Sequence, residues 1–170
     1  MSHRGDKAGG AGFTLVEVLI AVAIAGILTV LAISAFEGLS EKYRVEGETK
    51  QLYADLMDAR GRAMQRNRAV FVQIGASGYN TYEDTDPAPD GDGALDNTAD
   101  TPVAVVSMRH TMTPGGLANF RFNRNGIANA TGTIRISSTA SGVRPDYDCI
   151  NIQATRIKMG QFNAGTCVEK

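Results

Sequence analysis

Carboxylates gather in one short stretch of the sequence, residues 84–100, where glycine and proline separate them. The aspartates there that could bind a cation are Asp84, Asp86, Asp90, Asp92 and Asp96. Oxygen ligands on a glycine-rich loop suit Ca²⁺, but the spacing lacks the glutamate that ends an EF-hand loop. Two interpretations of this acidic loop therefore stay open, a calcium site and a solvated loop, and we expect no other cofactor.

Basic side chains alternate with apolar ones in the second half of the chain. Arg135, Arg156 and Lys158 would contact DNA phosphates if the fold brought them to one face. The same alternation is typical of the solvent-exposed side of a strand, and a formal net charge of −1 gives no field that would attract a polyanion. Binding to DNA is therefore only an alternative.

Nucleophilic catalysis would need a serine or cysteine in an activated context. A serine and an aspartate can be drawn beside His110, as in almost any chain of this size, but no nucleophile-elbow motif occurs. We do not expect an enzyme.

The elements that must position these residues begin with an apolar run near the N-terminus. Between Glu17 and Glu37 lie nineteen residues without a charge, enough for a helix across a hydrocarbon core of roughly 30 Å. Residues 1–12 are polar and net positive, which places them in the cytoplasm and the remainder outside. Because no good signal-peptidase site follows the run, we expect a single-pass anchor in the bacterial inner membrane with a periplasmic head.

The two cysteines of the chain, Cys149 and Cys167, lie close together in sequence. In a chain with an export-type segment this favours a disulfide over two free buried thiols. Such a bond would close a short loop at the C-terminus and stabilise the head by about 3 kcal/mol.

Helical spacing continues beyond the apolar run, and no proline precedes Pro87. One apolar stripe consists of Val45, Leu52, Leu56, Ala59 and Ala63. The pattern predicts one helix from about residue 14 to residue 66, with an apolar half over 13–36 and an amphipathic half over 37–68. From residue 69 the period becomes two, which predicts strands at 69–74, 79–83, 103–109, 119–122, 133–137, 149–154 and 156–159. We therefore predict an α+β fold, in which the helix packs on an antiparallel β-rich head, residues 69–170.

The segment GFTLVEVLIAVAIAGIL, which begins at Gly12, resembles the class III signal of type IV pilins and type II secretion pseudopilins. The resemblance implies that prepilin peptidase removes residues 1–12 by cleavage after Gly12, and that the same enzyme N-methylates Phe13. Glu17 matches a glutamate of the family's signal. A carboxylate in a bilayer needs a partner, and the nearest is the positive N-terminus of an adjacent subunit, so Glu17 would register one subunit against the next.

The segments LYADLMDARGRAMQRNRAVFV, FRFNRNGIANATGTIRIS and YDCINIQATRIKMGQFNAGTC are similar to minor pilins and pseudopilins of the GspH/FimT/FimU type. Thr155 departs from the glycine that is usual before their last strand. The resemblance implies a structural subunit that initiates or joins a type IV pilus or a type II secretion pseudopilus, with other pilins, the peptidase and the inner membrane as partners. Two alternatives stay open: a DNA-uptake minor pilin, and an uncleaved membrane-anchored binding or sensor protein.

Overall fold

The computed structural model describes residues 13–89 and 91–170, and for residues 31–35 it describes the backbone alone. The chain divides into two compact units, Met1–Glu37 and Gly38–Lys170. Helix α1, Leu15–Arg66, contributes its first part to one unit and its second part to the other. The long N-terminal helix predicted from the sequence is confirmed.

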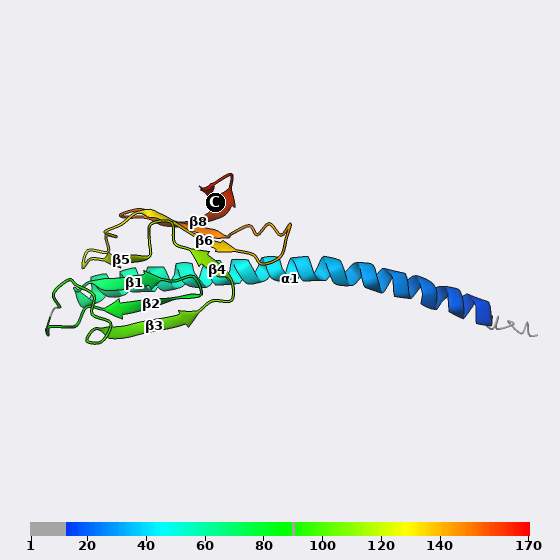
Figure 1. The fold of residues 1–170 in the computed structure, drawn as a ribbon, viewed down its shortest axis with the longest axis horizontal. Helices are drawn as coiled ribbons and strands as arrows, with labels where there is room; N and C mark the ends of the chain where they lie inside the picture. Colours follow the sequence, from blue (N-terminus) through cyan, green and yellow to red (C-terminus); the bar gives the residue numbers. More distant parts are fainter. Residues whose placement is uncertain (1–12, 90) are drawn as a thin grey trace, which may run out of the picture. The chain divides into compact units, whose positions relative to one another are not determined.

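In the second unit, two antiparallel sheets lie along the C-terminal part of α1 (Figure 1). The strand orders are β3-β2-β1-β5 in the four-stranded sheet and β4-β6-β7-β8-β9 in the five-stranded sheet. In chain order the strands are β1 (Val70–Ile74), β2 (Gly78–Glu83), β3 (Thr101–Ser107), β4 (Thr111–Thr113), β5 (Asn119–Phe122), β6 (Gly132–Ser137), β7 (Cys149–Ile152), β8 (Ile157–Asn163) and β9 (Thr166–Glu169). The predicted α+β architecture is confirmed.

One hydrophobic core joins the helix to both sheets. The predicted stripe is buried along its whole length, with Val45, Leu52 and Ala63 at 0% exposure and Leu56 and Ala59 at 1%. Each sheet contributes alternate residues of its strands to this core. They include Val70, Val72, Phe120 and Phe122 from the first sheet and Ile134, Ile136, Ile150 and Ile152 from the second. Burying one large aliphatic side chain contributes roughly 1.5–3 kcal/mol relative to exposure, so this shared core holds α1 against the head.

Two local features fix the end of α1 and its register on the first sheet. Asn67 follows the last helical residue with φ 56°, the left-handed conformation that commonly ends a helix. Tyr79 of β2 donates a hydrogen bond from its hydroxyl to the Asp55 carboxylate of α1. Burial raises the pKa of Tyr79, which keeps that hydroxyl a donor.

The strand predictions were right where apolar and polar residues alternate strongly and incomplete where they do not. β5 occupies the predicted residues 119–122, whereas β4 and β9 were not predicted. β4 has only three residues, and none of the four residues of β9 is buried, so neither strand shows the alternation of apolar residues that marks β5. Each forms by pairing with a longer strand, β4 with β6 and β9 with β8.

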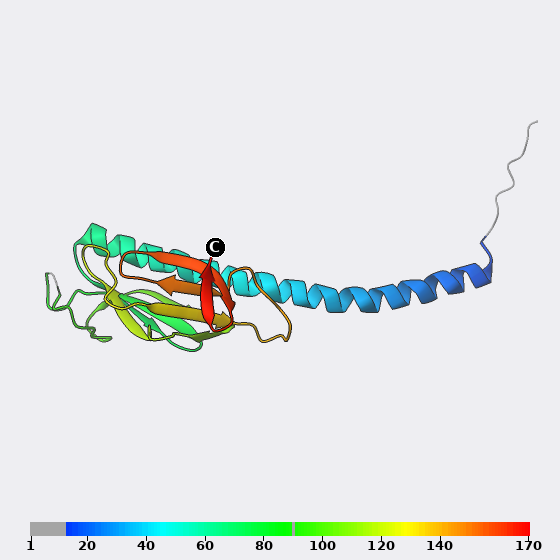
Figure 2. The same cartoon turned by 90° about the horizontal axis from the view of Figure 1, so that it is seen from above.

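A disulfide joins the two cysteines, as predicted. It links Cys149 of β7 to Cys167 of β9, although β8 lies between these strands in the sheet. The Cα atoms of the two cysteines are 5.9 Å apart because β9, red in Figure 2, turns across the direction of the neighbouring strands. The bond passes beside Gly160 of β8, where an added Cβ would lie 3.0 Å from the Cys167 Sγ.

Candidate functional site

The first unit presents a capped helix start with an apolar surface. The Glu17 backbone N–H donates to the Thr14 side-chain oxygen at 3.2 Å, the Thr-x-x-Glu arrangement of a capping box. Glu17 lies in the first helical turn, where a carboxylate also interacts favourably with the helix dipole. Gly12 and the rest of the predicted leader lie outside the described residues. The hydrogen bond of the cap uses the Glu17 backbone, and the helix dipole gives the Glu17 carboxylate a local role in addition to its predicted role between subunits.

Large apolar side chains cover this helix start. From Phe13 to Val30 they are 51–82% exposed. An apolar surface of this size marks a site of contact with lipid or with another protein. In the described part of the chain, which omits the side chains of residues 31–35, no helix is both long and apolar enough to cross a membrane.

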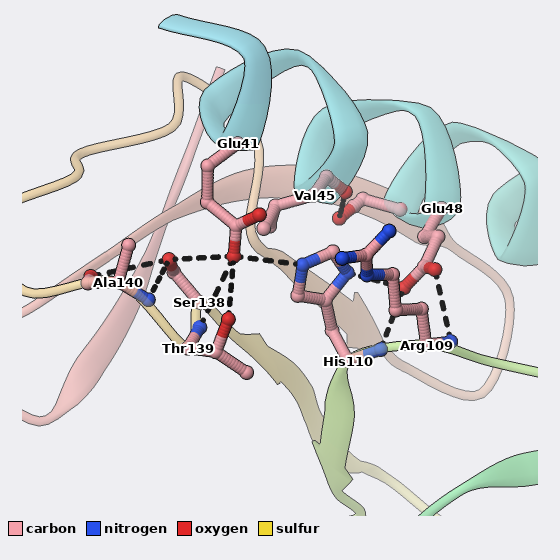
Figure 3. Close-up of polar contacts among 9 residues, drawn as sticks. Glu41, Val45, Glu48, Arg109, His110, Ser138, Thr139 and Ala140 are labelled. Atoms are coloured by element: carbon pink, nitrogen blue, oxygen red, sulfur yellow. Dashed lines mark hydrogen bonds and ion pairs between the residues drawn. The ribbon is translucent and has the colours of Figure 1, made fainter. Parts of the chain in front are cut away.

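The second unit contains a buried histidine held between two carboxylates of α1. His110, 1% exposed, places Nδ1 2.8 Å from Glu48 Oε2 and Nε2 3.0 Å from Glu41 Oε1 (Figure 3). Both ring nitrogens therefore face carboxylate oxygens, and only the doubly protonated imidazolium can donate to both at once. The arrangement ties the turn between β3 and β4 to α1.

Backbone and hydroxyl donors complete this cluster. The N–H groups of Arg109 and His110 donate to the two oxygens of Glu48, at 3.0 and 3.2 Å. Glu41 Oε1 accepts from the Ser138 hydroxyl at 3.2 Å and from the Thr139 hydroxyl at 2.9 Å (Figure 3). The Thr139 hydrogen bond, aided by His110 and opposed by burial, lowers the pKa of Glu41 from 4.5 to about 2.

A third helix carboxylate holds the far end of the loop between β6 and β7. Glu46, 6% exposed, accepts a hydrogen bond from the Asp146 N–H at 2.9 Å. The Asp146 side chain accepts one from Lys42 Nζ at 2.8 Å. We call Glu41, Glu46 and Glu48 the helix carboxylates. Together they fasten two loops of the head to one stretch of α1, which is a structural task.

The surroundings of His110 differ from those of a catalytic triad. The Ser138 hydroxyl donates to Glu41, and the His110 nitrogens face Glu41 and Glu48. The serine is therefore not oriented toward the imidazole as a nucleophile would be. The cluster suits the positioning of loops.

The acidic loop uses most of its carboxylates for its own backbone. Asp100, 3% exposed, accepts from the N–H groups of Thr85, Asp86 and Asp96. Asp96 accepts from Thr98, Asp92 from Ala94, and Asp84 from the Gly93 N–H.

The loop offers no assembled cation site within its described part. Asp84 is 2% exposed and its Oδ1 has no hydrogen-bond partner among the described residues. Asp90 lies outside the described residues. Among residues 13–89 and 91–170, no cluster of three or more acidic, histidine or cysteine side chains could hold a metal. Calcium binding at Asp84, Asp86, Asp92 or Asp96 stays a prediction.

The three cations considered for DNA fall into two environments of the five-stranded sheet. Lys158 Nζ lies 2.7 Å and Arg156 Nη2 3.6 Å from Glu169 Oε2. Arg135 instead stacks its guanidinium 4.3 Å from the centre of the Phe162 ring. DNA binding by these residues stays a prediction.

Comparison with known protein families identifies the family of the chain that carries these features. The family model described as type II transport protein GspH matches residues 48–155, more than half of the chain. The chain belongs to the GspH family. The prokaryotic N-terminal methylation motif matches residues 9–33 of this GspH-family chain. It is therefore a pilin or pseudopilin subunit of a type II secretion system or type IV pilus. No curated protein and no solved structure gives a significant match.

The contacts of the helix carboxylates with the head of this GspH-family chain were not predicted from the sequence. Charged residues on a helix are normally taken as solvated, and no family motif singled these out. A signal was present, because Glu41 and Glu48 lie four residues before and three residues after Val45 of the buried stripe. Carboxylates at those spacings lie on the buried face of a helix and need donors from the head.

Proposed function

We propose that this chain is a minor subunit of a pilus or a type II secretion pseudopilus. It is cleaved after Gly12, N-methylated on Phe13, and stored in the inner membrane with its head in the periplasm. It then enters the filament through its N-terminal helix. The observation that carries the proposal is the N-terminal methylation motif over residues 9–33, on a chain whose residues 48–155 match the GspH family.

The exposed surface of the first unit supports this proposal. Side chains that are 51–82% exposed from Phe13 to Val30 need an apolar environment, which a membrane provides before assembly and neighbouring helices provide afterwards. Glu17 is the one carboxylate among them, and the positive N-terminus of an adjacent subunit is a partner for it. Its role is to set the register between subunits.

The absence of proline before Pro87 supports the assignment to a minor subunit. Ser34 stands where many major pilins carry a helix-bending proline. The uninterrupted α1, Leu15–Arg66, agrees with that sequence feature. The head then serves as the surface for neighbouring subunits.

Intact-mass and N-terminal analysis of the chain, expressed with its prepilin peptidase, tests the processing step. The expected product begins at methylated Phe13. A chain that retains residues 1–12 would contradict the proposal and would favour the uncleaved anchored binding or sensor protein.

Two substitutions of Glu17 separate its local role from its role between subunits. Glu17→Gln removes the charge and keeps a residue that a capping box accepts, whereas Glu17→Ala removes both. We expect both variants to be processed and both to enter filaments poorly. Normal incorporation of Glu17→Gln would show that the charge is not needed and that only the cap matters.

A further inference from the structure

The outer side of the five-stranded sheet carries a polar pocket of about 410 Å³. It lies between the loop that follows β6 and the turn that joins β8 to β9. Two cations line it, Arg135 and Arg144, together with Phe162, Gln161 and Asp148. Its volume lies within the range of protein pockets that bind ligands.

Arg135 is held in place before any ligand arrives. Its guanidinium stacks 4.3 Å from the centre of the Phe162 ring, which leaves the edge of the guanidinium free to donate. Phe162 is fixed in turn, because its N–H donates to Asp148 Oδ1 at 2.5 Å. Arginine is one of the residue types enriched at the residues that dominate binding energy in protein interfaces.

Charge is unbalanced at this pocket. Within the part of the chain that the structure describes, neither Arg135 nor Arg144 forms an ion pair, whereas Arg156 and Lys158 on the same sheet share Glu169. Asp148, 8% exposed, is the acidic group that lines the pocket. Two unpaired cations beside one buried carboxylate match the charge of one further anionic group.

The chemistry favours a carboxylate over duplex DNA. A duplex presents one phosphate charge about every 1.7 Å and requires a run of free cations, and here the neighbouring cations are already paired. A single side-chain carboxylate needs only the fork of donors that one or two arginines supply. Exposed acidic segments of this kind exist in pilin-like heads, since Asp86, Asp92 and Asp96 of this chain are themselves exposed.

We propose that the Arg135–Arg144 pocket binds a carboxylate from an acidic segment of an adjoining subunit. The partner's identity as a subunit rests on the proposed function. The pocket then gives the head a contact separate from the N-terminal helix, and it selects neighbours that carry an exposed Asp or Glu.

A labelled peptide of the sequence DTDPAPDGDGALD, residues 84–96, provides the probe, and the same peptide with Asn for every Asp is its control. Binding to the full-length chain in detergent is measured by fluorescence anisotropy. We expect Arg135→Gln and Arg144→Gln each to weaken binding about tenfold, the loss of one charge-assisted hydrogen bond. Arg156→Gln, which removes an equal charge outside the pocket, should change binding less than about twofold.

The outcomes separate this proposal from its rivals. Equal binding of the Asn peptide, or equal weakening by Arg156→Gln, would overturn it. The rival outcome is that a short DNA duplex displaces the peptide and binds more tightly than it does. If that binding weakened in Arg135→Gln, Arg144→Gln and Arg156→Gln alike, the surface would be assigned to DNA. Arg144→Gln guards against a folding defect in Arg135→Gln, because Arg144 is exposed. Since the assay needs no filament, its failure leaves the proposed function intact, and failure of processing leaves the assay valid.

Discussion

His110 Nε2 lies 3.0 Å from Glu41 Oε1 in the buried contact between the head and α1. Glu48 holds the other ring nitrogen at 2.8 Å, so one imidazole bridges two carboxylates that are seven residues apart on the helix. A bridge of this kind depends on charge at both ends. Stability of the head should therefore depend on pH and on each member of the bridge.

Acid should weaken the fold through Glu41. Its folded pKa of about 2 lies below the ordinary glutamate value of 4.5, so its contribution is present above pH 4.5 and is lost as the pH falls toward 2. The contribution is at most about 3 kcal/mol. Urea unfolding of the full-length chain between pH 6 and pH 2 measures it. Glu41→Gln should be less stable at pH 6 and should show a flatter dependence on pH.

Two other carboxyl groups act in the opposite direction over part of this range. Burial raises the pKa of Asp84 and of Asp148, so their charged forms destabilise the fold and protonation relieves that effect. The free energy of unfolding of the wild type therefore falls less in acid than the protonation of Glu41 alone would make it fall. A pH dependence unchanged in Glu41→Gln would contradict the assignment to Glu41.

His110→Ala should destabilise the head by about 3 kcal/mol, because it removes the imidazole that lies between the Glu41 and Glu48 carboxylates and leaves their oxygens without that buried partner. The matched control is Arg109→Ala. The Arg109 side chain is exposed, and the hydrogen bond of Arg109 to Glu48 comes from its backbone N–H. Thermal and urea unfolding compare the two variants. Equal stability of His110→Ala and Arg109→Ala would mean that water replaces the imidazole at no cost.

Periodicity explains which parts of this fold could be predicted. The stripe from Val45 to Ala63 and the strand at 119–122 follow from spacing alone, because burial of one face requires it. Partners of single polar residues do not follow from spacing. The loop at Thr139 is 98 residues from Glu41, and the 144–148 segment that completes the arginine pocket joins Arg135 only through pairing of β6 with β7. Such contacts depend on tertiary structure.

Gly160→Ala should impair the C-terminal hairpin. An added Cβ would lie 2.2 Å from the Val168 carbonyl oxygen and 3.0 Å from Cys167 Sγ, so β9 would have to move away from β8. We expect slower disulfide formation, measured by thiol trapping, and a lower melting temperature. Gly47→Ala is the control, because its Cβ would meet nothing within 4 Å and alanine favours a helix by about 1 kcal/mol. Equal oxidation of both variants would contradict the close approach at Gly160.

Replacing both cysteines, Cys149→Ser with Cys167→Ser, should lower the free energy of unfolding by about 3 kcal/mol. The bond closes a loop with a sequence separation of 18, and opening it restores chain entropy to the unfolded state. Urea unfolding of the double variant measures the loss, and reduced wild type is the control for the substitutions themselves. Agreement between the two would assign the effect to the bond. A double variant as stable as the oxidised wild type would contradict it.

Asp84 provides the test of the acidic loop. Its carboxylate is 2% exposed, and burial raises its pKa, so the charge is unfavourable at neutral pH unless a cation joins it. Asp84→Asn keeps an oxygen that can accept from the Gly93 N–H and removes the charge. Without calcium, we expect the variant to be at least as stable as the wild type at pH 7 and the difference to vanish as the pH falls toward 4.

Adding Ca²⁺ after chelator treatment should leave both melting temperatures unchanged, because Asp92, Asp96 and Asp100 already accept hydrogen bonds from the loop. A calcium-dependent rise in the wild type that Asp84→Asn abolishes would instead establish the loop as a calcium site.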